Sequence, residues 1–202
     1  MEVGSTMRNK VNLIVLRHGH DESTLSDKKV HPFPNTPLSD LGRKTISASS
    51  ETLLHEEIEV VLSSPLLRAF QSSEIIRKKL GVPIYIVDEL KEWKPPSNVY
   101  GKSSAEYTEE YLHWKNIRHK KPNSFIEDGE SMTQIKHRIK AGQKIIKHHF
   151  NNYNKILVVS HLIYLRGLLG FIFNKKFNNG IHLFEPNNLI HIMYSEFIKV
   201  IL

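Results

Sequence analysis

Short apolar runs alternate along this chain with longer stretches in which apolar residues recur at helical spacing. Three of the runs, at residues 11–16, 58–62 and 156–159, stop abruptly at polar or glycine residues, a pattern typical of buried strands. Residues 82–87 form a fourth predicted strand. The first three runs each deliver a loop and then a helix-like stretch.

Helical periodicity occupies residues 39–55, 65–80, 103–119 and 131–150. Ser131 and Gln134 form a capping-box pattern at the start of the last helix. Ser64 followed by Pro65 suggests an N-cap with proline at the first helical position of the second helix.

Strand and helix alternate, and this alternation predicts an α/β fold with a mainly parallel sheet covered on both faces. The polar, aromatic and proline-bearing segment 89–128 breaks the alternation, so we interpret it as a small cap inserted near the active face. We expect one domain over residues 7–202, with 1–6 a tag or disordered terminus. Residues 181–184 and 189–194 are expected to form a pair of strands.

Composition excludes several classes of protein. The sequence has no cysteine, which rules out disulfides, thiolate metal sites and thiol nucleophiles. No apolar run approaches the length of about 18 residues that would suggest a membrane span, and no signal-peptide core opens the chain, so we expect a cytoplasmic protein. The net charge of +7 is scattered, which favours a solvated basic surface over nucleic-acid binding.

Residues capable of phosphate chemistry follow all four predicted strands. Arg17 and His18 follow the strand at 11–16, and Arg68 lies one helical turn after the strand at 58–62. Glu92 comes after the strand at 82–87, and His161 follows the strand at 156–159. Ligands of open parallel sheets bind beyond the carboxyl ends of the strands. We therefore expect these five side chains to converge on one edge of the sheet.

This set of residues suits phosphoryl transfer without a metal or other cofactor. Guanidinium groups are planar bidentate donors for phosphate, and a neutral imidazole can attack phosphorus to form a phosphohistidine. Arg17, Arg68 and a protonated or donating His161 would meet the charge of the transferred group. If the pocket raised its pKa, Glu92 would protonate the leaving oxygen and then take a proton from water in the second step.

At this point the chain resembles a known family, the histidine phosphatase superfamily, also called phosphoglycerate mutase-like. The resemblance is carried, in the family's order, by the segments Leu13-Ile14-Val15-Leu16-Arg17-His18-Gly19, Pro37-Leu38-Ser39-Asp40-Leu41-Gly42, Ser63-Ser64-Pro65-Leu66-Leu67-Arg68-Ala69-Phe70-Gln71-Ser72, Leu90-Lys91-Glu92, Gly129-Glu130-Ser131 and Val158-Val159-Ser160-His161. It implies a three-layer α/β/α Rossmann-like fold, nucleophile His18, a phosphate pocket of Arg17, Arg68 and His161, and proton donor Glu92. The short insertion favours a phosphatase over a mutase, whose inserts are longer.

The chain departs from the family pattern around the substrate. His20, Asp21 and Thr24 stand where the family usually has an acidic residue, threonine and asparagine, and Leu162 replaces the usual glycine after the second histidine. We treat His20, Thr24 and Leu162 as candidate substrate contacts. The expected partner is a small phosphorylated substrate, and the expected assembly is a monomer or a homodimer.

Several alternatives stay open. The pocket could support mutase-type phosphoryl transfer, or it could hold a phosphorylated ligand without turnover. The paired histidines of His18-Gly19-His20 are also found in metallohydrolases, although the fuller ligand pattern fails here. Asp88 and Glu89 compete with Glu92 for the role of proton donor, while Glu130 could support a helix start, pair with an arginine or touch substrate.

Overall fold

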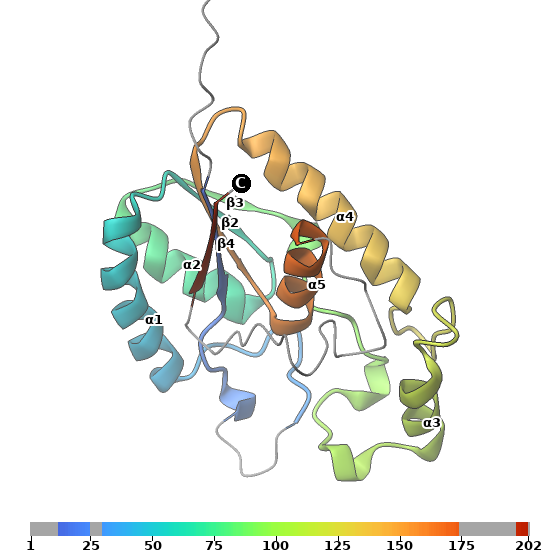
Figure 1. Ribbon diagram of the computed structural model, residues 1–202. Helices are drawn as coiled ribbons and strands as arrows, with labels where there is room; N and C mark the ends of the chain where they lie inside the picture. The colour runs from blue at the N-terminus through green and yellow to red at the C-terminus, as the bar shows by residue number, and fades with distance from the viewer. Residues whose placement is uncertain (1–11, 25–29, 174–196, 202) are drawn as a thin grey trace, which may run out of the picture.

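The carboxyl ends of parallel strands form one edge of a central sheet in the computed structural model, which describes residues 12–24, 30–173 and 197–201. Within these residues the strand order is β3-β2-β4-β1-β5 (Figure 1). The strands are β1 (Asn12–Arg17), β2 (Val60–Ser63), β3 (Ile84–Ile86), β4 (Lys155–Ser160) and β5 (Phe197–Ile201). β5 runs antiparallel to β1, and the other neighbouring pairs are parallel, so the predicted α/β class is confirmed.

The register of the strands aligns the ends that carry the predicted chemistry. Arg17 at the end of β1 lies opposite Ser160 at the end of β4, and Ser63 at the end of β2 lies opposite Val159. The backbone N–H of His18 extends the ladder by one bond of 3.0 Å to the carbonyl of Ser160. The residues that follow β1, β2 and β4 are therefore neighbours.

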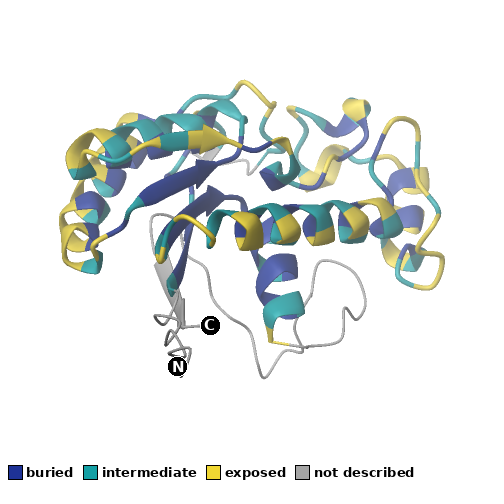
Figure 2. Ribbon diagram, turned by 90° about the horizontal axis from the view of Figure 1, so that it is seen from above, coloured by how far each residue is buried: buried dark blue, intermediate teal, exposed yellow. Residues whose placement is uncertain are grey.

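Helices cover both faces of the sheet because side chains of each strand alternate between the two faces. Leu13 and Val15 belong to the apolar cluster shared with α4 and α5, whereas Ile14 and Leu16 belong to the cluster shared with α1 and α2. These helices are α1 (Asp40–Leu53), α2 (Leu67–Leu80), α4 (Met132–His149) and α5 (Leu162–Ile172). Figures 1 and 2 show the resulting three layers, with dark blue strands between the helices in Figure 2.

The start of α4 follows the sequence prediction, but the start of α2 does not. Ser131 caps α4 and exchanges hydrogen bonds with Gln134, which confirms the capping box. The predicted N-cap at Ser64 is wrong, because α2 begins at Leu67 with Leu66 as its N-cap. The Ser64 hydroxyl is 2.8 Å from Nε2 of His161 instead, so a tertiary contact takes the side chain that a local pattern assigned to capping.

The segment 89–128 contains short helical turns, and the helix predicted at 103–119 is wrong in its first part. The elements are η3 (Asp88–Leu90), η4 (Ser97–Val99), η5 (Ser104–Glu106) and α3 (Glu109–Ile117). A capping box of Ser103 and Glu106 lies at the start of η5. Thr108 is the N-cap of α3, and its side chain accepts the N–H of Tyr111. Tyr107 and the N-cap Thr108 are both extended, and because an N-cap residue takes non-helical backbone, η5 and α3 are separate elements.

Some predictions fall outside the described residues, among them the strand pair at 181–184 and 189–194 and the terminal residues 1–6. Strand β5 was not predicted from the sequence. No helix in the described parts of the chain has the length and apolar character needed to cross a membrane.

Candidate active site

Six of the predicted site residues line one cavity of about 1060 Å³ beyond the carboxyl ends of the strands. They are Arg17, His18, His20, Arg68, Glu92 and Leu162. His161 is not part of the lining, because it is completely buried behind His18, with their ring centroids 4.9 Å apart. The backbone of Thr24 lies in a short turn, η1 (Glu22–Thr24), and its side chain falls outside the description.

The imidazole of His18 is held with one nitrogen facing the backbone and the other facing an arginine. Nδ1 is 2.7 Å from the carbonyl oxygen of Gly19, and since a carbonyl only accepts, Nδ1 carries the proton. Nε2 then has a free electron pair, toward which Nε of Arg68 donates over 3.3 Å. Burial, followed by the charges of Arg68 and Arg17, holds the pKa of His18 well below its usual value. The ring is therefore neutral, with a nucleophilic nitrogen.

Gly19 lets the loop after β1 pack against α1. A side chain at this position would meet the carbonyl oxygen of Gly42 and the side chain of Ile46, each at 2.8 Å. The N–H of Gly19 donates to the Ser72 hydroxyl in α2 over 3.1 Å. The glycine of the Arg-His-Gly segment thus fixes the position of His18 between two helices.

Two arginines act on the His18 imidazole. Arg68 is the second residue of α2 and is almost fully buried, and its Nη1 donates to the carbonyl of Phe33 over 3.1 Å. Arg17 ends β1 and lines the cavity, and its charge contributes to the lowered pKa values of His18 and His161. Fixed guanidinium groups beside a neutral imidazole form a site suited to an anion.

His161 has one partnered ring nitrogen and one without a partner. Its Nε2 bonds the hydroxyl of Ser64 at 2.8 Å, while its buried Nδ1 has no hydrogen-bond partner among the described residues. Burial, then the charges of Arg68 and the other nearby groups, keeps the pKa of His161 well below its ordinary value. The role of Ser64 was missed, although the segment that resembles the family includes this residue.

Glu92 reaches the same edge from a segment without regular structure. Its carboxylate accepts the N–H groups of Ile163 and Tyr164, both at 3.1 Å, and that of Trp93 at 2.9 Å. The first two donors belong to the first turn of α5, directly after His161. Two predicted residues that lie far apart in the sequence are thus brought to one place. The competitor Asp88 also lines the cavity but forms an ion pair of 2.6 Å with Lys91.

Asp21 is a polar neighbour of Arg68, and sequence reasoning did not place Asp21 in the site. Its carboxylate is buried, with Oδ2 3.5 Å from Nε of Arg68 and Oδ1 accepting the N–H of Ser23 over 3.1 Å. The sequence did mark Asp21 as unusual, because this residue stands at one of the positions that depart from the family pattern. The structure connects that departure to Arg68.

The outer part of the cavity contains two histidines whose environment disfavours protonation. Burial, and then the charge of Arg17, lowers the pKa of His20. Burial lowers the pKa of His31 to about 4, with Lys115, Arg68 and Arg118 adding to the effect. In the described residues no group of three or more histidine, aspartate or glutamate side chains is arranged to hold a metal ion.

Comparison with known proteins identifies related sequences over most of the chain. The model of the histidine phosphatase superfamily (branch 1) matches residues 13–195. Phosphoserine phosphatase 1 of Hydrogenobacter thermophilus is 25% identical over 198 residues, covering 89% of this chain and 90% of that protein. The uncharacterized phosphatase PhoE of Bacillus subtilis is 24% identical over 155 residues, covering 77% of this chain and 74% of that protein.

Solved structures share the fold. The mycobacterial glucosyl-3-phosphoglycerate phosphatase complexed with VO3 has a TM-score of 0.73 and 17% identity, covering 94% of this chain and 90% of that chain. The expected enzyme class, a hydrolase acting on phosphoric monoesters, agrees with the matched family and with the names of the related sequences. Because the family model spans most of its length, this chain belongs to the histidine phosphatase superfamily, branch 1.

Proposed function

We propose that this protein hydrolyses a small phosphomonoester in two steps through a phosphohistidine formed on Nε2 of His18. The observation that carries the proposal is the arrangement of that ring. The carbonyl of Gly19 holds the proton on Nδ1, and the charge of Arg68 stands beside the electron pair of Nε2. A neutral imidazole with a fixed tautomer beside bound cations is suited to attack on phosphorus.

In the first step, the substrate phosphate binds between Arg17 and Arg68. The electron pair of Nε2 forms a bond to phosphorus while the bond from phosphorus to the leaving oxygen breaks. Protonated Glu92 gives its proton to that oxygen, and Arg68 Nε turns from His18 to a phosphate oxygen. The product alcohol leaves, and the phosphoryl group stays on His18.

In the second step, water attacks phosphorus and the bond to Nε2 breaks. The Glu92 carboxylate takes a proton from the water, and inorganic phosphate departs with His18 and Glu92 restored. We assign to His161 a bond from Nδ1 to a phosphate oxygen. Support comes from the buried Nδ1 without a partner in the described residues and from the Ser64 hydroxyl, which occupies Nε2.

The part of the substrate beyond the phosphate faces His20 and Leu162, which line the cavity, and we retain Thr24 as a third contact. Relatives named phosphoserine phosphatase and glucosyl-3-phosphoglycerate phosphatase support net hydrolysis of a small phosphorylated metabolite. Inorganic phosphate is then the product, and no second phosphate acceptor is required.

The test compares the native protein with His18→Ala and with a control, His55→Ala, which removes an exposed histidine from the short helix after α1. We expect hydrolysis of p-nitrophenyl phosphate to fall by at least about 10³-fold in His18→Ala and to stay unchanged in the control. Acid-labile, alkali-stable phosphate should label the native protein and not His18→Ala during turnover of ³²P-substrate.

Each alternative function predicts a different experimental result. Full activity in His18→Ala would refute the phosphohistidine mechanism, and ligand binding without turnover by the native protein would show a binding module. Transfer of label to an alcohol acceptor in place of water would identify a mutase. Loss of activity in EDTA that a divalent metal restores would revive the metal-dependent alternative.

A further inference from the structure

The proton donor of the proposed mechanism lies on a segment that has no strand or helix of its own. Residues 91–96 connect η3 to η4, so backbone ladders do not hold Glu92 as they hold His18. Positioning a catalytic group to within a fraction of an ångström requires other contacts. We propose that Arg138 of α4, paired with Glu130, is the residue that positions Glu92. This inference rests on the proposed function.

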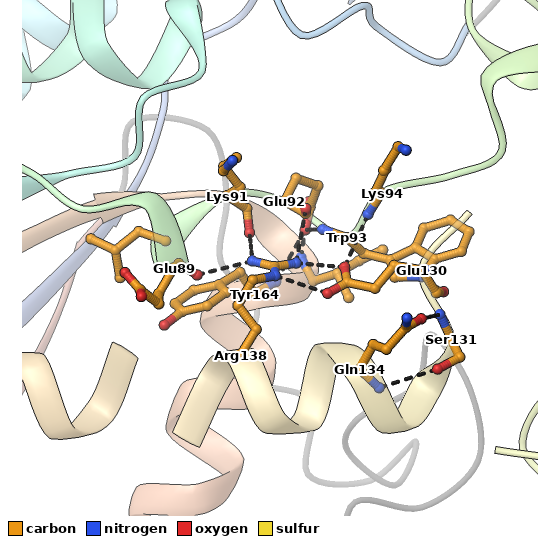
Figure 3. Close-up of polar contacts among 12 residues, drawn as sticks. Glu89, Lys91, Glu92, Trp93, Lys94, Glu130, Ser131, Gln134, Arg138 and Tyr164 are labelled. Atoms are coloured by element: carbon orange, nitrogen blue, oxygen red, sulfur yellow. Dashed lines mark hydrogen bonds and ion pairs between the residues drawn. The ribbon is translucent and has the colours of Figure 1, made fainter. Parts of the chain in front are cut away.

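The guanidinium of Arg138 binds the backbone of the donor segment directly (Figure 3). Nη1 donates to the carbonyl oxygens of Glu89 and Lys91 over 2.9 and 2.5 Å, and Nη2 donates to that of Glu92 over 3.1 Å. The contacts therefore fall on Glu92 itself and on the residues just before it.

The remaining donors of Arg138 go to Glu130, which lies just before the N-cap residue of the same helix. Nε donates to Oε1 over 2.8 Å and Nη2 donates to Oε2 over 2.6 Å, a bidentate ion pair. An arginine has five N–H donors, and these five hydrogen bonds use them all. Arg138 lines the cavity but has no donor left for a substrate phosphate, which favours a positioning role over a binding role.

Glu130 holds the segment from the other side of Glu92. Its Oε2 accepts the N–H of Lys94 over 3.2 Å, and its backbone N–H donates to the carbonyl of Lys94 over 2.8 Å. The indole N–H of Trp93 donates to the carbonyl of Glu130 over 2.7 Å. The segment is thus tied to Arg138 of α4 before Glu92 and to Glu130, just before α4, after it, as the dashed lines of Figure 3 show.

The carboxylate of Glu92 and its backbone are held by different helices that are themselves packed together. The carboxylate bonds the first turn of α5, including the N–H of Tyr164, while Arg138 from α4 lies with its guanidinium 5.7 Å from the centre of the Tyr164 ring. A side chain at Gly142 of α4 would collide with the Tyr164 hydroxyl, so the two helices are in close contact. Losing Arg138 would free the backbone half of this arrangement.

The expected signature of Arg138→Lys depends on the leaving group. Lysine keeps the charge opposite Glu130, but its compact ammonium cannot reproduce the planar fork that binds three carbonyls. A displaced Glu92 slows reactions whose leaving oxygen needs a proton and hardly affects p-nitrophenolate, which leaves unprotonated. We expect kcat to fall by about 10²-fold with an alkyl phosphate and by less than about 5-fold with p-nitrophenyl phosphate, with KM nearly constant.

The matched control is Arg77→Lys, which breaks a bidentate pair with Glu74 on the exposed side of α2 and should change neither rate. Glu130→Gln tests the same pair from the other partner and should give the same leaving-group pattern, which protects the test if Arg138→Lys fails to fold. Thermal melts followed by circular dichroism identify unfolded variants.

A combined variant separates positioning from other roles. Adding Arg138→Lys to Glu92→Gln should cost less than about 2-fold further, because both changes disable the same group. Equal losses with both leaving groups, a raised KM, or full additivity with Glu92→Gln would overturn the proposal. Failure of the proposed function itself would appear independently, as retained activity in His18→Ala.

Discussion

The two sides of the cavity position their functional groups in different ways. His18, Arg68 and His161 stand just beyond parallel strands, and the register of the sheet makes them neighbours. Glu92 lies on an irregular segment whose backbone carbonyls accept hydrogen bonds from the Arg138 side chain of α4. A site edge made by strand ends inherits the rigidity of the core, whereas the Glu92 edge depends on a few side-chain hydrogen bonds from Arg138 and Glu130.

The two sides of the cavity also differ in how strongly their effect on the rate depends on the substrate. Groups that bind and attack the phosphate act on every substrate, because each substrate presents the same phosphate. A proton donor matters only in proportion to how poorly the leaving oxygen departs. Comparing a poor and a good leaving group therefore reports on the two sides separately.

The largest effect on the rate is expected on the side of the cavity that is formed by the strand ends. Arg68→Met removes the guanidinium beside the proposed nucleophile His18, so kcat/KM should fall by roughly 10³-fold with both an alkyl phosphate and p-nitrophenyl phosphate. Arg77→Met on the exposed part of the same helix is the control. Initial-rate measurements check the prediction, and a loss confined to the alkyl phosphate would show that Arg68 serves the leaving group instead.

A smaller and selective effect is expected at Glu92. Glu92→Gln keeps one acceptor oxygen for the two N–H groups of α5 but has no acidic proton to give, so alkyl phosphate turnover should fall by about 10²-fold or more. Turnover of p-nitrophenyl phosphate should fall by less than about 10-fold. Glu89→Gln, which tests the competing carboxylate, should leave both rates near native; a selective loss there would move the donor role to Glu89.

Acid should lower the folding stability through His31, which lines the cavity. Its backbone N–H donates to the carbonyl of Lys102 and its carbonyl accepts the N–H of Gly101, both in the 89–128 segment. The pKa of His31 is about 4 in the folded protein against an ordinary 6.5, so between these values only the unfolded chain takes up the proton. The contribution of neutral His31 to the free energy of unfolding is fully present above pH 6.5. It is lost as the pH falls toward 4, and the loss reaches up to about 3 kcal/mol. Urea unfolding at several pH values should show a shallower pH dependence for His31→Gln, and parallel curves would refute the assignment.

The smallest effect is expected at Asp21, whose carboxylate offsets the charge of Arg68. Asp21→Asn should bind inorganic phosphate about 3- to 10-fold more tightly, since the guanidinium then faces the anion without a competing charge. The inhibition constant of phosphate measures this, with Asp40→Asn on the exposed start of α1 as control. Weaker binding would show that Asp21 orients Arg68 and that this role outweighs charge competition.

The edge made by strand ends was predictable from the sequence because its signals are local. A short apolar run followed by Arg17 and His18 identifies a strand and the loop after it, and parallel order then brings His161 beside that loop. Ser131 and Gln134 likewise identified the start of α4, since a capping box is contained within four residues.

What the sequence by itself determined was the alternation of β1 to β4 with helices along the chain and the residues that follow each of these strands. Only the tertiary structure decided the competition for side chains: Ser64 bonds His161 and does not cap α2, and Asp21 approaches Arg68. It also decided that Arg138 holds Glu92, because the acceptors are backbone carbonyls, which every residue has and which no sequence pattern marks. Such contacts depend on distance in space and leave no periodicity along the chain.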